Sequence, residues 1–215
     1  MTPARMIQLL SEEETKLIDH LFLGNGAKRM SVTFTAPQRH AGCTWLTIRT
    51  AQRLAERVEA SVCLVDANLH WPAIHAMFGI PNERGLFQAA MQPDEPIRDF
   101  VTRVPNTNLW VVPSGGPLTD SSAILSSEAM KNRIAELARE FDYVLIDTPA
   151  LKPCADSSLI GRLTDGVVLV IAANSSKRDI AVNAKMMLDA ADVTILGAVL
   201  NRRTFPIPDR IYQYL

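Results

Sequence analysis

The sequence predicts an α/β protein with a doubly wound, mostly parallel β-sheet of about six or more strands. Short runs rich in Val, Ile and Leu recur along the chain, as expected for strands that are buried on both faces. Helical patterns separate these runs, and such alternation favours right-handed crossovers between parallel strands. The strand-like runs lie at 32–35, 62–65, 109–112, 144–146, 167–171 and 194–200.

Apolar side chains repeat at helical spacing in two segments between the strands. Met130, Ile134 and Leu137 share one face of a predicted helix, and Ala184 and Leu188 share one face of another. Each helix therefore has an apolar stripe with which to cover the sheet.

The chain is predicted to have two parts. Residues 1–28 form a helical N-terminal appendage that ends in a glycine-containing stretch at 24–26. Residues 29–215 form one α/β domain with a short C-terminal tail. Within this domain, the proline-containing segment 92–108 is predicted to be a looped or partly helical insertion.

Composition narrows the classes of function. Of the 215 residues, 47% are hydrophobic and 21% are charged, which is typical of a globular protein, and the net charge of −1 gives no general attraction for nucleic acid. The apolar runs are too short to cross a bilayer, no signal peptide is visible, and the three cysteines are scattered. We therefore expect a cytoplasmic protein with reduced thiols, without direct membrane insertion and without a nucleic-acid partner.

The segment between the first strand and the next helix is a candidate phosphate loop, which we define as residues 37–44. In the pattern G-x-x-x-x-G-K-[ST], Gly42 and Thr44 match, whereas Pro37 replaces the first glycine and Cys43 replaces the lysine. A strand–helix turn capped by Thr44 is the alternative interpretation.

Polar side chains also follow three other predicted strands. Ligands of open parallel sheets bind beyond the carboxyl ends of the strands, so these positions are candidates for chemistry. Asp66 either has a chemical role, in which it holds a metal-bound water or activates a nucleophile, or it caps the following turn. Asp147 matches the strand-end carboxylate that reaches the Mg²⁺ shell of a bound nucleotide. Asn201 either reads an adenine edge or is a turn residue.

Taken in order, these segments resemble the bacterial tyrosine kinases of capsule and exopolysaccharide synthesis, in the MinD/ParA-like branch of P-loop ATPases. The resemblance implies that Asp66 is the second Walker aspartate, and that Asn201 lies at the adenine of ATP. It implies further that Thr44 and Asp147 bind Mg²⁺ if nucleotide binds, with Gly42 beside the phosphates. The residues that carry it are 64–72, 78–86, 141–149 and 196–201.

The sequence departs from the family at the catalytic positions. Cys43 replaces the lysine that balances phosphate charge, and Gln38 stands where this branch often has a second lysine. Asn68 replaces an aspartate, and His70 replaces an arginine. Arg39 lies in the same loop and is a candidate substitute cation, so it joins Gly42, Cys43, Thr44 and Asn201 as a candidate nucleotide-binding residue.

These departures lead to three hypotheses. The first is a degenerate kinase that acts in polysaccharide synthesis or export by binding partners, with weak ATP binding or none. The second is an active tyrosine autokinase or ATPase that uses Arg39, with Tyr212 and Tyr214 as phosphate acceptors, although these tyrosines also fit a packed amphipathic segment. The third is a dinucleotide-dependent oxidoreductase, which the absence of a G-x-G-x-x-G after the first strand disfavours.

The resemblance also implies partners. A membrane chain-length regulator, or another polysaccharide-export protein, would recruit the chain to the inner face of the membrane. Self-association remains open, because the family's N-terminal oligomerisation motif is not found in residues 12–22.

Overall fold

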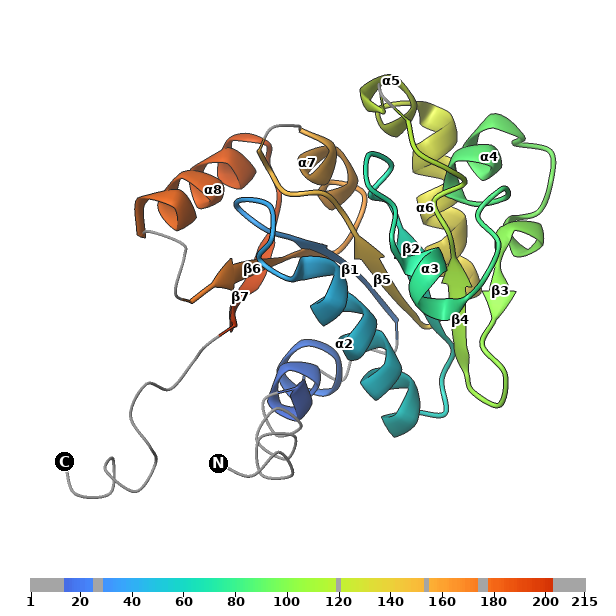
Figure 1. The fold of residues 1–215 in the computed structure, drawn as a ribbon, viewed down its shortest axis with the longest axis horizontal. Helices are drawn as coiled ribbons and strands as arrows, with labels where there is room; N and C mark the ends of the chain where they lie inside the picture. Colours follow the sequence, from blue (N-terminus) through green and yellow to red (C-terminus); the bar gives the residue numbers. More distant parts are fainter. Residues whose placement is uncertain (1–13, 25–28, 119–120, 153–154, 174–177, 203–215) are drawn as a thin grey trace.

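A computed structural model describes residues 14–24, 29–118, 121–152, 155–173 and 178–202. Within these residues, seven strands form one sheet in the order β3-β4-β2-β5-β1-β6-β7 (Figure 1). The strands are β1 (Met30–Thr35), β2 (Val62–Asp66), β3 (Thr102–Arg103), β4 (Leu109–Val112), β5 (Tyr143–Asp147), β6 (Gly166–Ala172) and β7 (Ile195–Asn201).

The sheet is parallel except at one edge. The pairs β1–β5, β1–β6, β2–β4, β2–β5 and β6–β7 are parallel, and β3 pairs with β4 in the antiparallel sense. The predicted doubly wound, mostly parallel sheet is therefore confirmed. The predicted insertion at 92–108 contains a 3₁₀ turn, η2 (Ile97–Phe100), and the edge strand β3, which the sequence pattern did not reveal.

Helices cover both faces of the sheet (Figure 1). One core cluster joins α2 and α3 to one face, and two further clusters join α4, α6, α7 and α8 to the other. Every residue of β2 and β5 is buried, which explains their apolar sequences. The helices are α2 (Cys43–Arg57), α3 (Ile74–Phe78), α4 (Leu86–Met91), α5 (Ser122–Leu125), α6 (Glu128–Glu140), α7 (Asp156–Gly161) and α8 (Arg178–Ala190).

The described part of the predicted N-terminal segment is helical and packs beside α2. It ends in a π-helical turn, η1 (Asp19–Leu23), after which the N–H of Gly24 donates to the Asp19 carbonyl. Ile18 and Phe22 are fully buried in the same core cluster as α2. This part of the segment therefore contributes to the core of the α/β domain.

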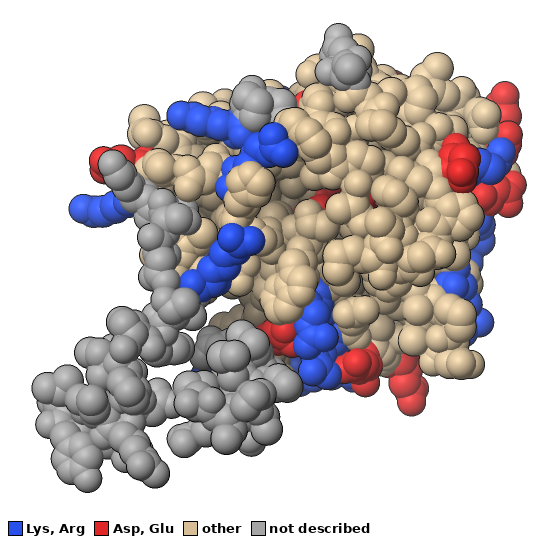
Figure 2. Space-filling view, viewed as in Figure 1, with Lys and Arg blue, Asp and Glu red and all other residues tan. Residues whose placement is uncertain are grey.

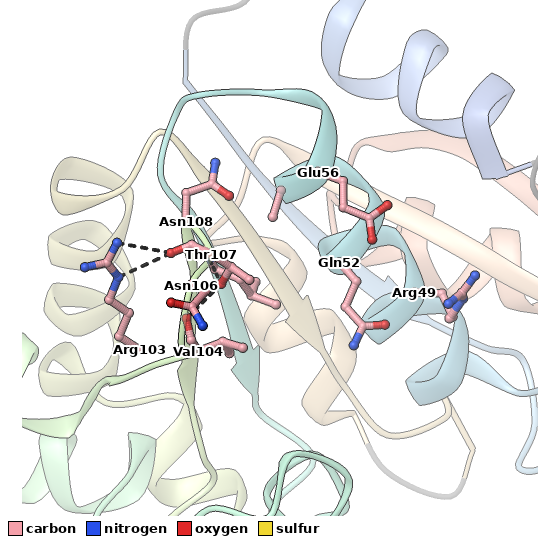
Figure 3. A pocket seen from close by; sticks show the side chains of 10 residues that line it. Arg49, Gln52, Glu56, Arg103, Val104, Asn106, Thr107 and Asn108 are labelled. Atoms are coloured by element: carbon pink, nitrogen blue, oxygen red, sulfur yellow. Dashed lines mark hydrogen bonds between the residues drawn. The ribbon is translucent and has the colours of Figure 1, made fainter.

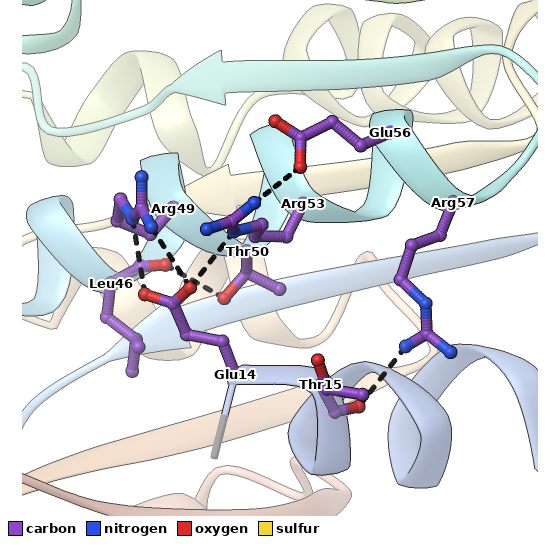
Figure 4. Close-up of polar contacts among 8 residues, drawn as sticks. All are labelled: Glu14, Thr15, Leu46, Arg49, Thr50, Arg53, Glu56 and Arg57. Carbon is purple, nitrogen blue, oxygen red and sulfur yellow. Dashed lines mark hydrogen bonds and ion pairs between the residues drawn. The ribbon is translucent and has the colours of Figure 1, made fainter. Parts of the chain in front are cut away.

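Ion pairs reinforce this packing (Figure 4). The Glu14 carboxylate is 7% exposed and accepts hydrogen bonds from Arg49 and Arg53 of α2 at 3.1–3.3 Å. One turn further along α2, the Arg57 guanidinium pairs with Asp19 at 2.7 Å. Because Glu14 is almost buried, its two arginines compensate for the lost hydration of its charge.

Among the residues described here, none of the helices combines the length and the apolar character needed to span a membrane.

Candidate functional site

The phosphate loop connects β1 to α2 and turns tightly at its last glycine. Gly42 has φ = +81° and precedes the first residue of α2, a left-handed conformation that favours glycine. A Cβ atom at this position would lie 2.5 Å from Asn201 Nδ2. Asn201, at the end of β7, donates from Nδ2 to the carbonyl of Ala41 at 2.8 Å. Asn201 therefore braces the loop, while its predicted role at an adenine stays a prediction.

The first turn of α2 is bonded to the end of β5. Thr44 Oγ1 donates to Asp147 Oδ2 at 2.7 Å, and the Asp147 side chain is fully buried. The other carboxylate oxygen, Oδ1, has no hydrogen-bond partner within the described residues. A buried oxygen in this state is costly unless a ligand satisfies it.

A hydroxyl beside an unsatisfied carboxylate oxygen fits a magnesium ion. Mg²⁺ prefers oxygen ligands and is usually bound by one or two carboxylates together with substrate phosphates. Thr44 and Asp147 offer such oxygens next to the start of α2, where the helix dipole favours phosphate. The arrangement of these two residues thus fits the cofactors that the sequence implied.

Asp66 lies beside Asp147 but is bonded differently. The two residues are paired in register on adjacent strands β2 and β5. Asp66 Oδ1 accepts from the N–H of Asn68, and Oδ2 accepts from the N–H groups of Ala73 and Ile74, all at 3.1 Å. Of the two interpretations of Asp66, the structure shows the cap of the following turn. A catalytic role stays a prediction.

The two carboxyls disturb each other electrostatically. Burial, and secondly the nearby charge of Asp66, raise the pKa of Asp147 from 3.8 to about 8. Burial raises the pKa of Asp66 from 3.8 to about 6, against the opposing effect of its backbone hydrogen bonds. Burial, followed by the charge of Asp147, also raises the pKa of the Cys43 thiol. The site therefore has two buried acids and no positive charge at position 43.

The candidate substitute cation, Arg39, is engaged elsewhere. Its guanidinium carbon lies 3.9 Å from the centroid of the Trp71 ring, in the loop that follows β2. Such stacking is a favourable cation–π contact. Next to Arg39, the exposed His40 has φ = +65°.

A second arginine, which the sequence analysis did not select, lies beside the loop. A Cβ atom at Gly42 would be 3.4 Å from Arg202 Nε. The signal that could have found Arg202 is its position directly after Asn201, at the end of β7. Figure 2 shows basic side chains between α8 and the start of α2, on the side where β1 and β6 end.

The structure thus brings together residues that follow the carboxyl ends of parallel strands, namely Gly42, Cys43, Thr44, Asp66, Asp147 and Asn201. The proposed phosphate acceptors Tyr212 and Tyr214 lie outside the described residues.

Another polar cluster joins the loop after β2 to α7. His70 Nε2 lies 3.0 Å from both Ser121 Oγ and Asp156 Oδ2, and Ser121 donates to the same Asp156 oxygen. A hydrolytic triad needs the two histidine nitrogens to contact the serine and the aspartate separately. Here one nitrogen contacts both groups, so the cluster is a structural bridge.

One hollow lies away from this site (Figure 3). It has a volume of about 640 Å³ and is lined by one face of α2 and the turn between β3 and β4. Several of its polar groups are bonded within the protein, as when Arg103 donates to the Thr107 carbonyl and Asn108 Nδ2 donates to the carbonyls of Val58 and Ala60. The hollow is at the start of β4, opposite the end where parallel sheets bind ligands.

The raised pKa values predict how stability depends on pH. Both folded-state pKa values exceed 3.8, so the stabilising effect of protonated Asp147 and Asp66 is complete below about pH 4. It declines as pH rises towards about 8, the folded pKa of Asp147. We expect Asp147→Asn to flatten this decline and to be more stable than wild type at about pH 8.5, as measured by urea denaturation.

The exposed Asp94→Asn variant is the matched control and should keep the wild-type pH dependence. An unchanged slope in Asp147→Asn would contradict the buried, protonated state of this carboxyl.

Sequence comparison finds relatives among bacterial kinases. No protein-family model matches the chain. The tyrosine-protein kinase YwqD of Bacillus subtilis is 31% identical over 140 residues, which are 65% of this chain and 59% of YwqD. CapB of Staphylococcus aureus is 25% identical over 209 residues, covering 95% of this chain and 90% of CapB. The match to YwqD thus spans less than two thirds of that relative's length.

Solved structures show the same fold. The kinase domain of VpsO superposes with a TM-score of 0.82 at 24% identity, covering 94% of this chain and 98% of that one. The septum site-determining protein MinD of Pyrococcus horikoshii, complexed with Mg-ADP, has a TM-score of 0.65 at 20% identity and covers 86% and 76%. The chain is thus similar to bacterial tyrosine kinases, and it has a P-loop fold of the MinD/ParA-like type.

Proposed function

We propose that this protein is a degenerate bacterial tyrosine kinase that acts in capsule or exopolysaccharide synthesis or export by binding partners. It binds Mg·ATP weakly or not at all, and it transfers phosphate poorly or not at all. The similarity to bacterial tyrosine kinases supports the proposed role in capsule or exopolysaccharide synthesis. The partner we propose is a membrane chain-length regulator or another export protein, which brings the chain to the inner face of the membrane.

The observation that carries this proposal is Cys43. The backbone around it supports a phosphate loop, since Gly42 has the left-handed turn and Thr44 is bonded to Asp147. The side chain at the lysine position is instead a neutral, partly buried thiol next to Asp147. Removing a charge-assisted contact to phosphate from a desolvated site costs roughly 2–5 kcal/mol.

The other residues of the site are better suited to binding a nucleotide than to transferring its phosphate. Thr44 and Asp147 would hold the magnesium ion, which neutralises phosphate charge when bound. Asp147 must lose its proton to do so, and its raised pKa opposes that loss near neutral pH. Asp66 accepts three backbone hydrogen bonds, and Arg39 stacks on Trp71.

The direct test is incubation with Mg·ATP followed by mass spectrometry of the C-terminal peptide. We expect little or no phosphorylation of Tyr212 or Tyr214, because each 1.4 kcal/mol or so of lost transition-state stabilisation lowers the rate about tenfold. Phosphorylation of wild type that disappears in Arg39→Ala would instead establish the alternative, an active kinase with a relocated cation.

Restoring the lysine should restore affinity. We expect Cys43→Lys to bind ATP about tenfold more tightly than wild type or better, because it adds one charge-assisted phosphate contact. Isothermal titration calorimetry measures this, with Cys43→Met as a control of similar length and no charge. Equal affinities for the three proteins would show that Pro37 and Gln38 have reshaped the loop beyond repair.

A further inference from the structure

Two arginines are close enough to the phosphate loop to replace its lost positive charge. Arg39 lies within the loop, but its guanidinium covers the Trp71 ring at 3.9 Å. Arg202 comes from the end of β7, and its Nε would lie 3.4 Å from a Cβ atom at Gly42. Among the described residues, the Arg202 guanidinium has no ion-pair partner, so its charge is available to a ligand.

The backbone of Arg202 is held in an unusual conformation. Arg202 has φ = +57°, in the left-handed region that residues with a Cβ atom rarely adopt. Its N–H donates to Asn201 Oδ1 at 2.9 Å, while Nδ2 of the same amide donates to the Ala41 carbonyl at 2.8 Å. One asparagine side chain thus joins Arg202 to the phosphate loop. Strain of this kind persists where surrounding contacts fix it and is frequent at ligand sites.

A second observation indicates that a ligand belongs here. The buried Asp147 Oδ1 has no partner in the described part of the chain, and its companion oxygen is bonded to Thr44 in the first turn of α2. A metal–phosphate group would satisfy both the carboxylate and the free N–H groups at the start of the helix. Such a ligand also has the negative charge that a neighbouring guanidinium binds well.

We propose that Arg202 is the phosphate-binding cation of this protein and replaces the missing lysine for a nucleoside di- or triphosphate bound with Mg²⁺. This inference rests on the proposed function, because it assumes the same weak nucleotide site. A guanidinium binds phosphate with two parallel N–H groups, which lysine cannot do. Arg202 reaches the loop from the end of β7, whereas a lysine at position 43 would start from α2. The positive charge that binds the phosphates is thereby kept, but it approaches the loop from β7 and not from α2.

The test is calorimetric titration of the full chain with Mg·ADP. We expect Arg202→Gln to weaken binding about tenfold, because it removes one charge-assisted contact and keeps a polar, uncharged side chain. Arg202→Lys should bind more tightly than Arg202→Gln and less tightly than wild type, because it keeps the charge but loses the two parallel N–H groups. Arg139→Gln, which removes an exposed arginine of α6, is the matched control and should bind like wild type.

A double-mutant cycle sharpens the test. In the Cys43→Lys background the loss caused by Arg202→Gln should shrink, because two cations that serve the same phosphates are not additive. Equal binding by wild type and Arg202→Gln, or no binding of Mg·ADP by wild type at millimolar concentration, would overturn the role of Arg202.

The two proposals fail separately. If wild type and Arg202→Gln bind Mg·ADP equally, the role of Arg202 is wrong, but the proposal of a kinase without phosphate transfer is unaffected. Tyrosine phosphorylation by wild type overturns the proposed function, whereas a binding loss in Arg202→Gln still supports Arg202.

Discussion

The hydrogen bond from Thr44 to Asp147 fixes the geometry on which the site depends. It joins the first turn of α2 to the end of β5, so the phosphate loop has to close between β1 and that point. Because β5 lies between β1 and β2, the same bond places the loop beside Asp66. Two buried acids then lie side by side at the carboxyl ends of β2 and β5. This end of the sheet is stable near neutral pH when a proton or a cation compensates for their charge.

The site has two halves, one that would hold the metal ion and one that would hold the phosphates. We call them the metal half and the phosphate half. In the metal half, Thr44 comes from the first turn of α2 and Asp147 from the end of β5, and the hydrogen bond between them is present. The phosphate half relies on the turn at Gly42, which Asn201 braces across 160 residues of sequence. Cys43 leaves this half without the positive charge of a lysine, although the left-handed turn at Gly42 is present. A protein that works through partners needs the fold and not the transfer, which is consistent with the proposed function.

Much of the fold could be predicted from the sequence because burial on both faces leaves a strong pattern. Six strands were found as continuous apolar runs, whereas β3 has two partly exposed residues and no such pattern. In the site, Thr44 and Asp147 were predicted from loop spacing and strand ends. The stacking of Arg39 on Trp71 and the approach of Arg202 to Gly42 depend on how loops from different strands meet. Such contacts are tertiary, and the sequence indicates only that Arg202 directly follows Asn201 at the end of a predicted strand.

The most direct measurement for this account is a crystal structure of the protein with ADP and Mn²⁺, which replaces Mg²⁺ and scatters anomalously. The central claim is that the metal half of the site is intact. The positive charge that binds the phosphates then comes from a residue outside α2. The account predicts an anomalous peak next to Thr44 Oγ1 and Asp147 Oδ1, with the Arg202 guanidinium on the phosphates. Metal bound away from Thr44 and Asp147, or phosphates held by Arg39 with Arg202 turned away, would contradict it.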